Sequence, residues 1–257
     1  MIYDIQKASL LKRVSAFLLD IILWSIAAVG FIFLLSAVLK FDSKLNDLQS
    51  YYDKYETMYN IKFNTDQDEY DKLTDEEKNN YDANLKLAQD AISNDKDAVK
   101  ALTVVMNYTL IMVTIGFLLA SIILYVVIPL ILKNGQTVGM KCFSLCLVMP
   151  NSTKVTPFAL CVRAILGQFT IETMIPTYII IMLYFGTTGL FGTIILLALL
   201  IVQIVLVFAT KNHQVIHDLI SCTVVVDKSS QMIFNNQDEL MKYKEDLHQK
   251  EVQKASY

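Results

Sequence analysis

Long apolar blocks separate the polar segments of this chain, and four of these blocks are long enough to cross a bilayer. They cover residues 14–39, 104–132, 158–183 and 190–209. The hydrocarbon core of a bilayer is about 30 Å thick, and a helix of about 20 apolar residues crosses it. The pattern therefore predicts an all-α membrane protein with four transmembrane helices. A cleaved signal peptide is the alternative for the first block, but its apolar core would be only about 7–15 residues long.

The composition agrees with a membrane protein. The 257 residues are 54% hydrophobic and 18% charged, with a mean hydropathy of +0.43. Soluble domains are about 45–50% apolar and about 25% charged. An ordinary soluble domain is thus excluded, and the lipid bilayer is the first expected partner.

A polar, acidic segment at residues 41–103 separates the first two apolar blocks. It holds 15 acidic and 8 basic residues, and every basic one is lysine. Thr74 and Glu77 have the spacing of a capping box at the start of a helix. Apolar and aromatic residues recur at helical spacing before it, at Leu45, Leu48, Tyr52, Tyr55 and Tyr59. We expect an extracytoplasmic helical hairpin, whose acidic face is either a solvated surface or a cation site.

These blocks divide the chain into seven parts. In order they are the N-terminus with the first transmembrane helix (1–40), the acidic insert (41–103), the second helix (104–132), a cytoplasmic or interfacial loop (133–157), the third helix (158–183), the fourth helix (187–210) and a cytoplasmic tail (211–257).

Basic residues of short loops orient membrane proteins, because such loops tend to stay in the cytoplasm. Here they lie before the first span, in the second loop and after the fourth span, at Lys7, Lys12, Arg13, Lys133, Lys141, Lys154 and Lys211. This distribution predicts a multi-pass protein of the plasma membrane with both termini in the cytoplasm. The insert would then face outward.

The loop between the second and third spans has an apolar centre at residues 140–149 that is too short to cross a membrane. It can form an interfacial helix, a re-entrant segment or a short β-hairpin, and we expect it to pack against the spans at the membrane surface. Residues 223–227 have the β-branched content of a strand.

Charged residues inside the apolar blocks are the main candidates for function, because a charge in hydrocarbon needs a partner or a role. Asp20 is the only charged residue between positions 14 and 39, and Arg13 lies on the same helical face, about 10 Å away along the axis. Glu172 lies deep in the third block. Arg163 precedes it by nine residues, so an α-helix would place the two on opposite faces.

Other chemistries find little support. Cys142, Cys146, Cys161 and Cys222 are expected to be reduced thiols, and the four-residue spacing of His213 and His217 is more typical of surface or supporting histidines than of a metal site. The glycines near Thr137 lack the P-loop spacing, so nucleotide binding is not expected. We predict no metal, no cofactor and no nucleic-acid partner. Because no nucleophile–base pair is visible, enzymatic activity is also not expected.

Taken in order, the polar motifs resemble those of the RDD family of membrane proteins. They are an arginine that begins the first helix, an aspartate within that helix, a glycine-rich turn after the second helix and an H-D-x-x-x-x-T-x-V tail. The matching positions are Arg13, Asp20, Gly135, Thr137, Gly139, Lys141, His217, Asp218 and Thr223, and Arg163 opens the third span. The resemblance covers about residues 8–40 and 104–226. The acidic insert departs from the compact domain of the family.

The resemblance implies a transport role, since cation–proton exchange has been proposed for some members. We therefore expect a small transporter, or a transporter subunit, with Asp20 and Glu172 as proton or cation carriers. Four spans are few for one pathway, so this interpretation favours a homo-oligomer. The alternatives are that Arg13, bridging Asp20 and Asp218, forms a cytoplasmic latch that only locks the helices, and that the protein is a scaffold whose insert binds a partner protein.

Overall fold

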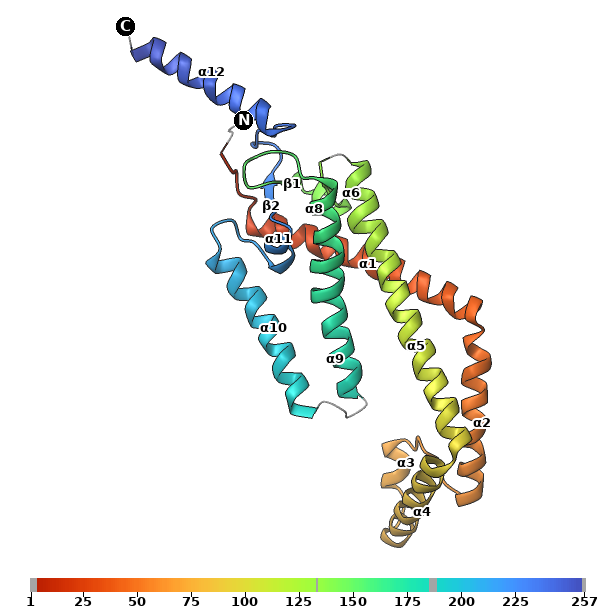
Figure 1. Cartoon of the computed structure of the whole chain (residues 1–257). Helices are drawn as coiled ribbons and strands as arrows, with labels where there is room; N and C mark the ends of the chain where they lie inside the picture. The colour runs from red at the N-terminus through yellow and green to blue at the C-terminus, as the bar shows by residue number, and fades with distance from the viewer. Residues whose placement is uncertain (1–3, 133, 185–188, 256–257) are drawn as a thin grey trace. The chain divides into compact units, whose positions relative to one another are not determined.

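The structure is a computed structural model that describes residues 4–132, 134–184 and 189–255 (Figure 1). Four of its helical stretches are long and apolar enough to cross a membrane, at residues 10–39, 96–131, 157–183 and 189–209. The chain is therefore an all-α membrane protein with four candidate spans, as the hydropathy pattern predicts. The predicted fourth helix (187–210) begins at two residues that lie outside the described ranges.

The described elements follow one another in a simple order. They are α1 (Leu10–Leu39), α2 (Phe41–Tyr59), α3 (Gln67–Asp71), α4 (Asp75–Asn94), α5 (Lys96–Ile122), η1 (Ile123–Val127), α6 (Ile128–Ile131), α7 (Val138–Cys142), β1 (Leu145–Val148), α8 (Pro157–Val162), η2 (Arg163–Met174), α9 (Ile175–Tyr184), α10 (Gly189–Ala209), α11 (Ile216–Ile220), β2 (Val224–Asp227) and α12 (Gln237–Ala255). They fall into two compact units, one of residues 30–116 and the other of residues 1–29 with 117–257.

The unit of residues 30–116 contains the acidic insert, in which α2 packs on α4. The predicted capping box is present, since the Thr74 hydroxyl accepts from the Glu77 N–H and Glu77 accepts from the Thr74 N–H. Near the end of α2, Tyr55 donates to Asp95, which caps the end of α4, at 2.9 Å. This contact joins the C-terminal parts of the two helices, whereas the antiparallel helices of the expected hairpin would place the end of α4 near the start of α2.

The second unit carries a two-stranded sheet beside its helices. β1 pairs antiparallel with β2, with Leu145 opposite Asp227 and Val148 opposite Val224. On the other side of β2, Lys7 of the N-terminal segment forms a bridge with Val226. Residues 140–149 thus form the end of α7 and a strand whose main partner is the tail. The expected local hairpin is reduced to one antiparallel bridge, between Val148 and Lys154. The partner strand lies almost eighty residues further along the chain, so local pattern could not identify it.

Both faces of this small sheet are buried. Leu145 and Leu147 pack with Ala16 and Leu160 from the first and third spans. On the other face Cys146 lies among valines, and burial raises the pKa of its thiol to about 12. Such a thiol stays protonated at neutral pH and is therefore a poor nucleophile.

The third span is not an ordinary α-helix over its middle part. Residues 163–174 of η2 have the wider π-helical turn, in which bonds join residues five apart. The same spacing recurs in the side-chain bonds from Thr170 to the Ile165 carbonyl and from Thr173 to the Gln168 carbonyl, both at 2.8 Å. α8 and α9 flank this segment, and α10 lies beside α9 (Figure 1).

The short helix α11 after the fourth span packs directly onto η2. Gly167 makes this close approach possible, because a Cβ there would lie 2.4 Å from Cβ of His217 and 2.7 Å from its Cα. The polar end of the molecule is therefore assembled around a glycine of the third span.

Replacement of Gly167 by alanine should lower stability by about 1–3 kcal/mol, the usual range for overpacking. Gly30→Ala is the matched control, because a Cβ at Gly30 in α1 would meet no atom within 4 Å and alanine is the better helix former. Thermal unfolding of the purified protein in detergent checks both variants. Equal midpoints for Gly167→Ala and the wild type would contradict the close packing of α11.

Candidate functional site

Asp218 is the centre of a buried charged network in the unit of residues 1–29 and 117–257. Its Oδ2 lies 2.9 Å from Nη2 of Arg13, and its Oδ1 lies 2.9 Å from Nη2 of Arg163. The side chain is completely buried. Burial by itself raises the pKa of this carboxyl, but the positive charges of Arg163 and Arg13 beside it hold the pKa below its ordinary value. Asp218 is thus held as a carboxylate between two guanidinium groups.

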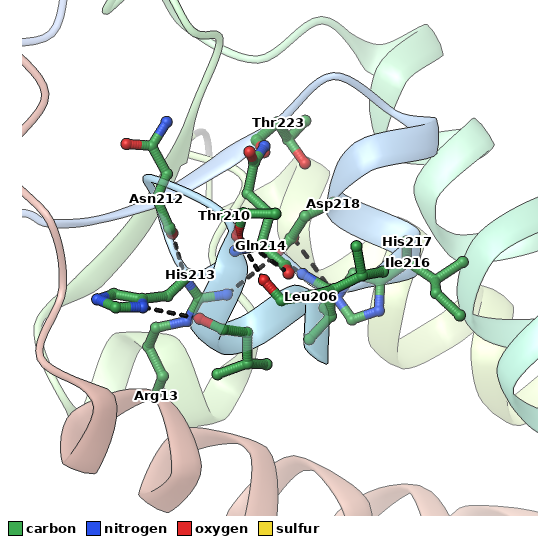
Figure 2. Close-up of polar contacts among 12 residues, drawn as sticks. Arg13, Leu206, Thr210, Asn212, His213, Gln214, Ile216, His217, Asp218 and Thr223 are labelled. Carbon is green, nitrogen blue, oxygen red and sulfur yellow. Dashed lines mark hydrogen bonds and ion pairs between the residues drawn. The ribbon is translucent and has the colours of Figure 1, made fainter. Parts of the chain in front are cut away.

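Arg13 also ties the first span to the loop that follows the fourth. Its Nη1 donates to the Asn212 carbonyl at 3.0 Å (Figure 2). The same loop is closed by the Gln214 N–H, which donates to the Thr210 hydroxyl at 2.7 Å, and by His213, whose Nδ1 lies 2.8 Å from the Val207 carbonyl. The start of α1 is therefore fixed to the end of α10.

The structure changes the expected role of Arg13. We expected it to bridge Asp20 and Asp218, but its side chain contacts Asn212 and Asp218. Asp20 lies nearly two helical turns further into the span and has donors of its own. The bridge is instead made by Asp218, which joins two arginines.

His217 links this ion pair to the carboxylate of the third span. Its Nε2 lies 2.7 Å from Nη2 of Arg163, and its Nδ1 lies 2.6 Å from Oε2 of Glu172. A guanidinium has only donors, so Nε2 must accept and the proton of the neutral ring must sit on Nδ1. Arg163 therefore selects the neutral tautomer that donates to Glu172.

Glu172 accepts two further hydrogen bonds, both at Oε1. One comes from Nε2 of Gln203 in α10 at 2.7 Å, and the other from the His217 N–H at 3.2 Å. Gln203 in turn accepts from the Ile216 N–H at 3.3 Å. The fourth span and the tail are thereby joined to the third span through one carboxylate.

Arg163 and Glu172 act on the same histidine although they are nine residues apart. An α-helix would place them on opposite faces, and no direct pair was therefore expected. The two indeed meet only through His217 among the described contacts. The expected faces were nevertheless wrong, because the segment is π-helical and its wider turn brings residues nine apart back to the same face.

Asp20 occupies a separate polar site formed with α7. Its Oδ1 accepts from the Gly139 N–H at 2.8 Å, and its Oδ2 accepts from the Thr137 hydroxyl. Thr137 also caps α7 by accepting from the Met140 N–H. A Cβ at Gly139 would lie 2.2 Å from the Ala16 carbonyl oxygen, so only glycine allows α7 to reach the first span this closely.

The remaining motif residues hold the surrounding turns. Gly135 has a φ of +61° and packs against Val155, and Lys141 is exposed on α7. Thr223 is buried and donates its N–H to the Asp218 carbonyl at 2.9 Å. These residues position the network and do not enter it.

Glu172 and Gln203 also line a groove of about 250 Å³. The other residues of its wall are apolar: Ile171, Pro176, Leu196, Leu199, Leu200 and Ile216. The side chain of Glu172 is 18% exposed, whereas that of Asp218 is fully buried. Glu172 is therefore the charged member of the network that lines this groove.

Sequence analysis singled out most of the charged residues of this network and the contact of Arg13 with Asp218, but not the contacts that Arg163, His217 and Glu172 make. It missed Gly167 and Asn212, for which the local sequence carries no signal. Gln203 stands out in the sequence as the main polar residue of an otherwise apolar span, but its partner Glu172 could not be read from the sequence. Among the described residues, no group of three His, Cys, Asp or Glu side chains could hold a metal ion.

The fold and the network define a helical membrane protein with four candidate spans, in which the first candidate span, the third and the tail meet through paired arginines and aspartate. A model of the RDD family matches residues 7–222, which is most of the chain, and the protein belongs to this family. No curated protein and no solved structure matches the chain.

Replacement of Asp218 by asparagine should cost about 3–5 kcal/mol at pH 7, because it leaves two buried arginines without their counter-charge. The native pKa of Asp218 is depressed, so its contribution is present above the unfolded value of about 3.9 and is lost as pH falls through the native pKa. Thermal midpoints measured across pH should therefore converge for variant and wild type in acid. Asp238→Asn on the exposed side of α12 is the control. A difference that stays constant down to about pH 2 would contradict this assignment.

Proposed function

We propose that this RDD-family membrane protein exchanges a cation for protons across the membrane, with Glu172 as the exchanging carboxylate. The observation that carries the proposal is the position of Glu172. It lies within the third candidate span, is hydrogen-bonded to a neutral histidine and borders a groove. Carboxylates held in such surroundings are typical of ion and proton pathways.

The charges of the network favour competition between a proton and a cation. Arg13 and Arg163 balance Asp218 and Glu172 when His217 is neutral. A proton on Glu172 and a monovalent cation beside it each leave one net positive charge. The two ligands therefore exclude each other at the same group, which is the requirement for one-to-one exchange.

Asp20, the other carrier candidate, has a different environment. Two donors from the 137–139 turn hold its carboxylate in place, and the residue is 8% exposed. We assign Asp20 to positioning: it holds α7, and through α7 the sheet, against the first span. Arg13 and Asp218 are then the latch that fixes the first span to the segment after the fourth.

The predicted orientation is part of the proposal. Contacts of Arg13 with Asn212 and Asp218 support placing the start of the first span and the end of the fourth on one side of the membrane. Their neighbouring basic residues favour the cytoplasmic side. The protein would then be a multi-pass protein of the plasma membrane with both termini inside. Because four spans are few for a pathway, we propose that it works as a homo-oligomer.

A membrane scaffold whose insert binds a partner protein is the second candidate. It is favoured by the compactness of the unit of residues 30–116, which has its own capping box and tyrosine–aspartate contact. Exchange by the membrane-embedded carboxylates does not require this unit.

Replacement of Glu172 by glutamine should abolish cation-dependent proton flux in proteoliposomes, measured per folded protein, because an amide cannot exchange a proton for a cation. Asp20→Asn should lower folded yield, since an amide nitrogen faces one of the two donors, but the flux per folded protein should be kept. Asp238→Asn is the control with unchanged flux and yield. Wild-type flux in Glu172→Gln would refute the exchange role, and normal yield with no flux in Asp20→Asn would return Asp20 to the carriers.

Orientation can be read from cysteine labelling of intact cells. The exposed Ser93 in the insert, replaced by cysteine, should react with a membrane-impermeant maleimide. The native exposed Cys222 should react only after permeabilisation, and it provides the internal control in the same chain. Labelling of Cys222 in intact cells would place the tail outside.

Deletion of residues 43–100 with a short linker separates the two candidate functions. The charged network lies wholly in the other unit, so thermal stability and proton flux should be retained. As a control, residues 43–100 are replaced by a scrambled sequence of the same length as the deleted segment, which keeps the length of the connection between the first two spans. Loss of flux with an intact thermal transition would make the insert part of the exchange mechanism.

A further inference from the structure

The groove beside Glu172 has a composition that restricts what it can bind. Glu172 and Gln203 are hydrogen-bonded to each other at 2.7 Å, so its polar lining is a single patch. Six aliphatic or proline side chains form the rest of the wall. A ligand must therefore bring one polar group and an apolar body.

The charge of the patch sets the sign of the ligand. Of the residues that line the groove, Glu172 is the charged one, and its carboxylate is partly exposed. The two arginines of the network are buried behind it, at 12% and 6% exposure of their side chains. The group presented to the groove is thus an anion.

A bare metal cation fits this groove poorly. Hard cations take about six oxygen ligands to replace their water shell. The groove offers the Glu172 carboxylate and the Gln203 carbonyl oxygen, which already accepts from the Ile216 N–H. Hydrocarbon walls cannot supply the rest. An organic cation needs no such shell, and its apolar body gains from burial against leucine side chains.

We propose that this groove binds a lipophilic organic cation, an ammonium group carried on an apolar or aromatic body, with its charge against Glu172. This inference names the class of substrate for the proposed exchange. That the bound cation is a substrate rests on the proposed function, but the binding itself does not. Binding to the groove can be measured without any transport.

Benzyltrimethylammonium is a suitable probe, because its fixed charge prevents it from carrying a proton across the membrane. Its binding to the full chain in an uncharged maltoside detergent is measured by equilibrium dialysis. Glu172→Gln should weaken binding about tenfold or more. Leu196→Trp, which fills the groove, should do the same, whereas Leu197→Trp on the neighbouring, 53% exposed position should bind as the wild type does.

The neutral isostere neopentylbenzene, in which carbon replaces the nitrogen, tests the role of charge. It should compete with the probe at least tenfold more weakly than the unlabelled cation. Equal competition would show a purely apolar site and overturn the proposal. So would unchanged binding in Leu196→Trp, a comparison that stands even when Glu172→Gln does not fold.

The outcomes also separate this inference from the exchange function. Cation-driven proton flux with sodium, potassium or lithium, together with no binding of the probe by the wild type, would refute the organic-cation groove and leave exchange standing. Binding of the probe that depends on Glu172, without flux for any cation, would support the groove and refute exchange.

Discussion

The neutralisation of Asp218 by two arginines is the interaction on which the rest of the polar end depends. A carboxylate removed from water needs compensation by nearby opposite charge and by donors, and removal of one partner leaves the others uncompensated. Here the partners come from the first and third spans, while Asp218 itself follows the fourth. One buried charge therefore fixes three segments that are far apart in the sequence, and the neutral state of His217 is a consequence of the same arrangement.

The π-helical part of the third span extends the ion pairs of Asp218 into a continuous network that includes His217 and Glu172. Its wider turn places Arg163 and Glu172 on one face, so that a single imidazole contacts both. Gly167, between them, leaves room for the backbone of α11. π-helical turns are uncommon and often occur at functional sites. Glu172, the proposed exchange group, thus owes its position to the π-helical segment of the third span.

The spans and the insert helices could be predicted from sequence because their signals are local. A run of apolar residues or a capping box is contained within a few turns of chain, and Thr74 with Glu77 is an example. The partners of Asp20 and the pairing of β1 with β2 could not be predicted, because they join segments about 120 and 80 residues apart. The faces of Arg163 and Glu172 were predicted wrongly for another reason, because an α-helical period of about 3.6 residues was assumed for a π-helical segment. The type of each candidate residue could thus be read from the sequence, whereas its contacts could be found only in the tertiary structure.

The pairing of Arg13 with Asp218 spans 205 positions, and this distance has a consequence for biosynthesis. A ribosome releases the arginine long before the aspartate, because the four apolar stretches lie between them. Until then the guanidinium lacks this counter-ion and must stay with water or lipid headgroups. A nascent chain that stops before residue 218 keeps the Asp20 contacts of the first helix but lacks the ion pair at its start.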